Sequence, residues 1–159
     1  MNLLVQAGDT PSRRTARYIA SVVDQLGYRG HLLTKSDAFG ASIDPHTQFA
    51  GYQLGWLQDF TAASDFVLPL FSCEALNGSG ANVSGFCNAQ IDRLAAKASA
   101  EPSTAAAGKA WARGDRAIVD QAPAVPLYTL RSVDFVSKRV GDYVYNPEYG
   151  ALLDQLWVR

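Results

Sequence analysis

The first 35 residues constrain the fold more than any other part of the chain, because they combine a strand, a helix and a second strand in close succession. Leu3-Leu4-Val5 is a short apolar run, and Asp9 or Thr10 can cap a helix with Pro11 in its first turn. Gly27 supplies a stop, and residues 30–34 have the composition of a strand. The apolar residues at helical spacing between them are Tyr18, Ile19, Val22, Val23 and Leu26. This order predicts a right-handed βαβ crossover between parallel neighbouring strands.

The remainder of the chain alternates between helical and strand patterns. Residues 36–48 are typical of an irregular connection with one helical turn, residues 49–57 predict a strand, and residues 62–71 predict a helix. Two helices that we expect to pair begin at Asn88 and Pro102, and strands are predicted over residues 124–130 and 133–140. The side chains expected to be buried in these helices are Phe66, Val67, Leu70, Ile91, Leu94, Ala95, Ala98, Ala107, Trp111, Ile118 and Val119. The predicted fold class is α/β, with a mixed sheet flanked by helices.

Length and charge limit the classes of function. At 159 residues and 48% hydrophobic, the chain has enough apolar material for one domain, residues 1–159, with a core. A net charge of -1 with scattered basic residues gives no reason to expect nucleic acid or an anionic membrane as a partner. No apolar run approaches the roughly 20 residues of a membrane span, and Met1-Asn2-Leu3-Leu4-Val5 lacks the pattern of a signal peptide. We expect the chain as given to be soluble.

The only cysteines of the sequence, Cys73 and Cys87, flank a segment rich in Gly, Ser and Asn. A disulfide is the favoured interpretation, because closing a loop of roughly 15 residues restricts the unfolded chain by about 3 kcal/mol and such a polar segment buries little. It implies an oxidising compartment. The alternative is two unrelated thiols. A zinc site is not favoured, because the cysteines, His31 and His46 have no recognisable ligand spacing.

Enzyme motifs are absent from the sequence. There is no Gly-x-Ser-x-Gly elbow, no phosphate-binding loop and no pair of histidines at i and i+4. His31 and His46 are more often structural or solvated in such positions than general bases. Asp9 after the first strand fits anion-binding or phosphoacceptor geometry, but capping the next helix is the simpler interpretation. Asn82-Val83-Ser84 matches a glycosylation pattern too short to decide anything.

The segment Gly55-Trp56-Leu57-Gln58-Asp59-Phe60 places an aromatic ring and a carboxylate where a predicted strand runs out into a loop, and this pattern predicts a pair that faces a ligand. With Asn88-Ala89-Gln90-Ile91-Asp92 and Ala124-Val125-Pro126-Leu127-Tyr128 further along, this segment resembles the C-terminal lobe of a family 5 extracellular solute-binding protein, an oligopeptide or dipeptide receptor of ABC importers. The resemblance spans nearly the whole chain and follows the order of the family's segments. It implies a periplasmic-binding-protein-like lobe of type II.

The resemblance also implies a ligand site. Asp59 matches the carboxylate that receives a peptide's α-amino group, and Trp56 and Leu57 match a strand end whose backbone pairs with an extended peptide. Phe60 and Tyr52 would add apolar wall. The alternatives are that Asp59 caps the following helix and that Trp56 belongs to the core. Gln53 departs from the family, because some members have a basic residue there that meets a ligand carboxylate.

The function implied by the resemblance is the substrate-binding component, present here as a fragment, of an ABC transporter that imports peptides or related small solutes. The implied partners are the solute, an ABC permease and the N-terminal lobe of the same receptor, which this chain lacks. The implied location is extracytoplasmic, with a lipid anchor in the full-length protein, and no cofactor or catalysis is expected. Two alternatives are a small α/β enzyme or regulatory domain that uses Asp9 and Asp59, and an interaction domain whose Trp and Tyr residues bind a protein.

Overall fold

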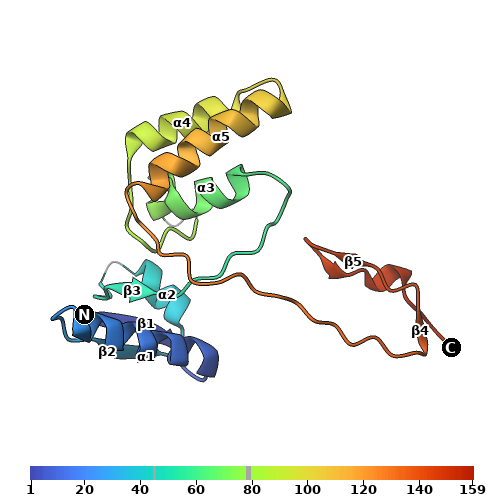
Figure 1. The fold of residues 1–159 in the computed structure, drawn as a ribbon, viewed down its shortest axis with the longest axis horizontal. Helices are drawn as coiled ribbons and strands as arrows, with labels where there is room; N and C mark the ends of the chain where they lie inside the picture. Colours follow the sequence, from blue (N-terminus) through green and yellow to red (C-terminus); the bar gives the residue numbers. More distant parts are fainter. Residues whose placement is uncertain (45, 78–79) are drawn as a thin grey trace.

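The fold has three groups of elements in the computed structural model, which describes residues 1–44, 46–77 and 80–159. They are an N-terminal α/β group, a group of helices and a C-terminal pair of β-ribbons (Figure 1). The fold class predicted from the sequence is confirmed, and its strands form one parallel sheet and two antiparallel pairs.

The N-terminal group contains the predicted strand, helix and strand. β1 (Asn2–Gln6) pairs in parallel with β2 (His31–Lys35), so that Leu3 lies opposite Leu32, and α1 (Thr10–Gln25) connects them. β3 (Gly51–Tyr52) pairs in parallel with the other side of β1, which gives the order β2-β1-β3. The strand expected over residues 49–57 is therefore correct only for Gly51 and Tyr52, because the chain joins the sheet at Gly51 and leaves it after Tyr52.

α1 begins and ends as its sequence predicts. The side chain of Asp9 accepts hydrogen bonds from the backbone N–H of Ser12 at 3.2 Å and from the Ser12 hydroxyl at 2.5 Å. Gly27, just past the end of the helix, has a φ of +89°, a conformation that favours glycine. The capping interpretation of Asp9 is confirmed.

The face of α1 that packs on the sheet is narrower than expected. Leu3, Val5, Ala16 and Ala20 form the core of this group, whereas Tyr18 and Leu26 are each 71% exposed. Small side chains let the helix approach the sheet closely. A Cβ added at Gly30 would lie 2.8 Å from Ala20, so this approach also requires glycine immediately before β2. The connection between β2 and β3 contains the helical turn that was expected, α2 (Ala38–Ile43), which Asp37 caps.

The helical group consists of α3 (Ser64–Phe71), the 3-10 helix η1 (Glu74–Asn77), α4 (Ala89–Ser99) and α5 (Thr104–Val119). α4 and α5 pack against each other, and α3 lies against α4 (Figure 1). The predicted pairing is confirmed. The buried cluster is Val67, Ile91, Ala95 and Ile118. The burial predicted for Val119 is wrong, because this side chain is 64% exposed, and Phe66 is also exposed, at 38%.

A disulfide joins Cys73 to Cys87 and confirms the favoured interpretation of the two cysteines. The loop that it closes is held from inside by Asn82, which is 6% exposed. The side-chain amide of Asn82 donates to the carbonyl oxygen of Ser72 at 3.0 Å and to that of Phe86 at 2.7 Å. Phe86 packs edge-on against Phe71, so the loop and α3 share one apolar contact.

After α5 the chain runs in extended form away from the helices (Figure 1). The strands predicted over residues 124–130 and 133–140 are wrong in this part of the chain, because only Val140 of those residues is in a strand. β4 (Val140–Gly141) pairs with β7 (Trp157–Val158), and β5 (Tyr145–Asn146) pairs with β6 (Gly150–Ala151), both antiparallel. The 3-10 helix η2 (Leu153–Gln155) precedes β7. None of the described helices has the length and apolar character needed to cross a bilayer.

Candidate ligand-binding site

The candidate site is built on two connections that meet at Gln53 and Tyr128. Residues 53–63 lead from β3 to α3, and residues 120–139 lead from α5 to the C-terminal ribbons (Figure 1). The side-chain amide of Gln53 donates to the hydroxyl of Tyr128 at 2.5 Å, which joins the two connections although they are far apart in the sequence. The segments singled out from the sequence around Trp56 and Pro126 therefore meet in space.

Asp59 lies in the first connection with an exposed side chain. Within the described residues its carboxylate has no hydrogen-bond or ion-pair partner. Its backbone N–H donates at 2.8 Å to Oδ2 of Asp65, which is 4% exposed in the first turn of α3. The N-cap position of α3 is Ala63, so Asp59 does not cap that helix. Asp65 holds the backbone of Asp59 in place and leaves the Asp59 carboxylate available to a cation.

Trp56 and Gln53 each contribute a buried polar atom to this connection. The indole Nε1 of Trp56 and the side-chain Oε1 of Gln53 have no hydrogen-bond partner in the described part of the chain. A buried polar group without a partner costs about 1–3 kcal/mol. Their hydrogen bonds must come from solvent, a ligand or further polypeptide. Trp56 itself is partly buried, so it is neither a core residue nor a surface residue.

The apolar residues predicted to line the site are only partly covered. Leu57 is 79% exposed and Phe60 is 50% exposed, whereas Tyr52 is partly buried at the end of β3. Burial raises the pKa of the Tyr52 hydroxyl, and the carboxylates of Asp37 and Asp9 raise it further. Both carboxylates follow the ends of neighbouring parallel strands, so the carboxyl edge of the sheet is acidic. Tyr52 stays a neutral hydrogen-bonding phenol at physiological pH.

The C-terminal ribbons also reach the site. The hydroxyl of Thr61 donates to Oε1 of Glu148, which lies between β5 and β6. Sequence reasoning missed Glu148, Asp65 and the bond between Gln53 and Tyr128. Only Asp65 had a local signal, as an acidic residue in the first turn of a helix; the other contacts join residues 75 and 87 positions apart.

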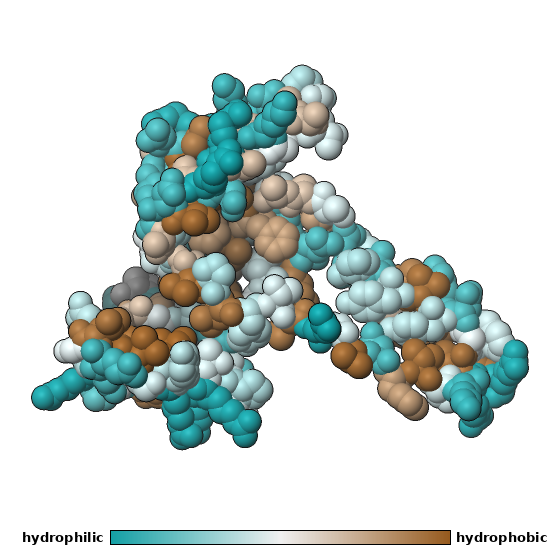
Figure 2. Space-filling model, in the orientation of Figure 1, coloured by the Kyte–Doolittle hydropathy of each residue, from teal (hydrophilic) through white to brown (hydrophobic). Residues whose placement is uncertain are grey.

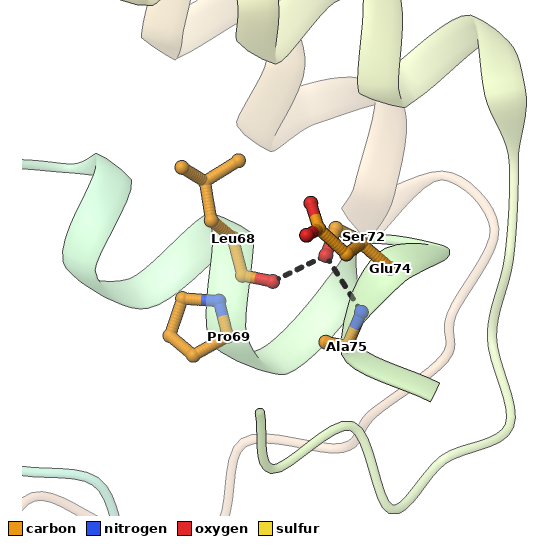
Figure 3. A pocket seen from close by; sticks show the side chains of 5 residues that line it. All are labelled: Leu68, Pro69, Ser72, Glu74 and Ala75. Carbon is orange, nitrogen blue, oxygen red and sulfur yellow. Dashed lines mark hydrogen bonds between the residues drawn. The ribbon is translucent and has the colours of Figure 1, made fainter. Parts of the chain in front are cut away.

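A shallow groove elsewhere on the helical group does not coincide with these residues. It lies between α3 and η1, has a volume of about 250 Å³ and is lined by Leu68, Pro69, Ser72, Glu74 and Ala75 (Figure 3). The Ser72 hydroxyl donates to the carbonyl oxygen of Leu68 at 2.6 Å and accepts from the N–H of Ala75 at 3.2 Å. The backbone of the chain thus already forms hydrogen bonds with the Ser72 hydroxyl in this groove. Residues 52–60 are therefore the better candidate site.

The two aspartates of the enzyme or regulatory alternative, Asp9 and Asp59, have separate places in the fold. Asp9 is used as a helix cap, and the side chains of His31 and His46 are exposed. The described residues contain no group of three or more His, Cys, Asp and Glu side chains that could hold a metal ion. Asp9 immediately precedes α1, whereas Asp59 lies in the connection that leads to α3.

The chain is similar to known proteins in its structure. No family model and no curated protein matches the sequence. Among solved structures, the murein tripeptide-binding protein MppA of Escherichia coli matches 99% of this chain with a TM-score of 0.80 and 22% identity. A dipeptide-binding protein from Pseudoalteromonas sp. SM9913, in complex with Met-Leu, matches 100% of the chain with a TM-score of 0.78 and 22% identity. OppA of Burkholderia pseudomallei matches 99% with a TM-score of 0.78 and 22% identity.

The chain therefore has the fold of part of a periplasmic solute-binding protein. The matched structures are peptide-binding proteins of the family 5 type, so the resemblance seen in the sequence is confirmed at the level of the fold. The chain covers 32% of the Pseudoalteromonas protein and 30% of each of the other two, which is about a third of their length.

Proposed function

We propose that this chain is the C-terminal lobe of an extracytoplasmic receptor that binds a peptide or a related small solute and delivers it to an ABC importer. The observation that carries the proposal is the match of essentially the whole chain to peptide-binding proteins, with TM-scores up to 0.80. The matched length includes both connections that form the candidate site. The partners in this proposal are the solute, the permease and the rest of the receptor.

In the proposed complex, Asp59 pairs with the ammonium group of the ligand. The physical support is its exposed carboxylate without a partner in the described residues, on a backbone fixed by Asp65. A charge-assisted hydrogen bond of this kind contributes about 1.5–3 kcal/mol once the cleft excludes water. A neutral ligand would leave the carboxylate without compensation.

In the proposed complex, the residues near Asp59 bind the ligand without recognising its side chains. The backbone of Trp56 and Leu57 pairs with an extended peptide, and Phe60 and Tyr52 form the apolar wall. Support for this role is the partial exposure of these side chains beside Asp59. Gln53 is neutral and bound to Tyr128, so a ligand carboxylate finds no positive charge at this position. We infer a preference for ligands with a cationic end.

The receptor would work outside the cytoplasm and perform no covalent chemistry. Two lobes would close on the ligand by hinge motion, and the permease would recognise the closed form. The disulfide between Cys73 and Cys87 fits an oxidising compartment. A lipid anchor on the complete receptor belongs to the same proposal.

The test is calorimetric titration of the complete receptor with peptides, comparing Asp59→Asn with a matched control, Asp115→Asn. Asp115 is an exposed carboxylate on α5 and is not part of the candidate site. We expect Asp59→Asn to weaken binding of free-amine peptides at least about tenfold. N-acetylated peptides should bind the two variants alike. Equal loss in both variants, or no loss in Asp59→Asn, contradicts the role of Asp59.

A further inference from the structure

The outward face of α1 combines an arginine with a row of exposed apolar side chains. Arg14, Tyr18 and Val22 follow one another at intervals of four residues, so they lie next to each other along one side of the helix. Leu26, at the C-cap position, continues this row. Tyr18 and Leu26 are each 71% exposed and Val22 is 37% exposed. The row lies on the solvent side of α1, because the buried alanines of the helix face the sheet.

Three arginines, Arg13, Arg14 and Arg17, gather in the first half of α1. Their side chains are exposed, and none of them forms an ion pair or hydrogen bond within the described residues. The first turn of the helix has no acidic residue, and the carboxylate of Asp24 accepts a hydrogen bond at 2.8 Å from the backbone N–H of Gly30. Cations near the start of a helix oppose its dipole. The stability of α1 therefore does not explain why three arginines lie there.

The charge of the chain is distributed unevenly, which the net charge of -1 conceals. Residues 1–35 contain five Lys and Arg residues and two Asp residues, whereas residues 36–92 contain six Asp and Glu residues and no Lys or Arg. Such an asymmetry is typical of chains that meet an anionic partner with one part only. The net charge gave no reason to expect an anionic membrane, but the arginines of α1 form a local positive surface.

We propose that the outward face of α1 binds the surface of a membrane that contains anionic phospholipids, peripherally and reversibly. This occupant follows from charge and polarity together. Arginine side chains form bidentate hydrogen bonds with phosphate groups, and tyrosine and leucine side chains bury themselves at the boundary between head groups and acyl chains. A nucleic acid or a free phosphate would engage the arginines and leave Tyr18, Val22 and Leu26 without a role.

The surface continues past the end of α1. Tyr28 is 60% exposed and Arg29 is exposed beside it, so the residues after the helix have the same mixed character. Figure 2 shows hydrophilic side chains projecting from the N-terminal group on the side where Figure 1 places α1. At 1.5 Å per residue, the row from Arg14 to Leu26 is about 18 Å long, which lets α1 lie flat on a bilayer. Residues 52–60 are not part of this surface, so the inference does not rest on the proposed function.

The test is sedimentation of the 159-residue chain with lipid vesicles. We expect the chain to bind vesicles in which about half of the lipid is phosphatidylglycerol at least about tenfold more tightly than vesicles of phosphatidylcholine alone. Sodium chloride at about 0.5 M should weaken this binding, because it screens the charges at the surface. Equal binding to both kinds of vesicle, or binding to neither, overturns the proposal.

A matched pair of double variants separates the α1 surface from net charge. Arg14→Gln/Arg17→Gln should weaken binding to the anionic vesicles at least about tenfold, since each cation near such a surface changes binding about fivefold. Arg113→Gln/Arg116→Gln removes the same charge from exposed positions of α5 and should change binding less than about twofold. If both double variants lose binding equally, attraction follows net charge alone and the proposal fails.

The apolar part of the surface is tested separately. Leu26→Gln should weaken binding at least about threefold, whereas Val119→Gln, on the similarly exposed Val119 of α5, should leave it unchanged. Circular dichroism checks that each variant is folded. If Leu26→Gln has no effect, the surface recognises phosphate and not a bilayer, and the proposal fails.

The complete receptor, prepared without an acyl chain, should bind the same vesicles with the same dependence on Arg14 and Arg17. Absence of binding would show that another part of the polypeptide covers α1 and would overturn the proposal. Peptide titration of the same variants keeps the two proposals apart, because a variant that loses vesicle binding should keep its affinity for peptides. Loss of vesicle binding and of peptide binding together in Arg14→Gln/Arg17→Gln would reject a separate membrane surface.

Discussion

At the scale of single residues, the side chain of Asp9 fixes the start of α1 by capping it. The Ser12 hydroxyl, and after it the Ser12 backbone N–H, hold the pKa of Asp9 below its ordinary value of 3.8. Because the folded pKa lies below the unfolded one, the contribution of this cap is complete above about pH 4 and is lost as the pH falls through the folded value.

We therefore expect Asp9→Ala to lower the melting temperature at pH 7 but to differ little from the unchanged protein near about pH 2. Thermal unfolding followed by circular dichroism at both pH values measures the difference. Asp115→Ala serves as a control, because Asp115 is exposed on α5 and its side chain makes no hydrogen bond within the described residues, so the change should alter the melting temperature little at either pH. A cap effect that persists undiminished at low pH argues against the carboxylate as its source.

The bond between Gln53 and Tyr128 gives a second test at this scale. Tyr128→Phe removes the hydroxyl and should cost about 0.5–1 kcal/mol, because the contact is exposed and a typical net hydrogen bond is small. A double-mutant cycle with Gln53→Met in urea unfolding should give a coupling energy of the same size. Strict additivity of the two variants would mean that the connections are not joined by this bond.

At the scale of elements, Ile118 and Val119 form a matched pair at the end of α5. Ile118 is 5% exposed in the cluster with Val67 and Ile91, whereas Val119 is 64% exposed. Ile118→Ala should destabilise the chain by about 2–5 kcal/mol and Val119→Ala by no more than about 0.5 kcal/mol. Urea unfolding measures both. Similar losses in the two variants would show that α5 buries a different face.

Helices were predictable from the sequence because their signals are local. Asp9, Gly27 and Asn88 act within one helical turn of their own positions, and the structure uses each of them as expected. Strands depend on partners elsewhere. Leu3-Leu4-Val5 forms a strand because β2 and β3 lie on either side of it. Residues 124–130 were also predicted as a strand, but they pair with no strand in the described part of the chain.

The candidate site was predictable to the same limited extent. A carboxylate beside a tryptophan in a loop can be read from the sequence, and the structure confirms that Asp59 is exposed and does not cap α3. The contacts of Gln53 with Tyr128 and of Thr61 with Glu148 depend on how distant segments are placed. Propensity and periodicity carry no information about such contacts. The ligand roles of Trp56, Leu57, Asp59, Phe60 and Tyr52 remain predictions.

At the scale of the whole molecule, the candidate site lies at the junction of the three groups of elements. The first connection comes from the α/β group, Asp65 belongs to the helical group, and Glu148 comes from the ribbons. The helical group contacts this connection at Asp59, and the ribbons contact it at Thr61. The side facing solvent is open, because Leu57 and Phe60 remain exposed there. A ligand bound at this junction would therefore remain open to solvent on the side of Leu57 and Phe60.

This openness predicts how the isolated chain and the complete receptor differ in affinity. Binding must offset the lost translational and rotational freedom of the ligand, and a site that is open to solvent offers fewer contacts to do so. We expect calorimetric titration of the 159-residue chain with the dipeptide Met-Leu to give no saturable heat below about 1 mM. In the proposed receptor, closure of a second lobe would remove water from the Asp59 carboxylate, so the complete receptor should bind its own peptide ligands at least about 100-fold more tightly than the isolated chain binds them. Micromolar affinity of the isolated chain for Met-Leu, abolished by Asp59→Asn, would show instead that this lobe forms the whole binding surface and that closure adds little.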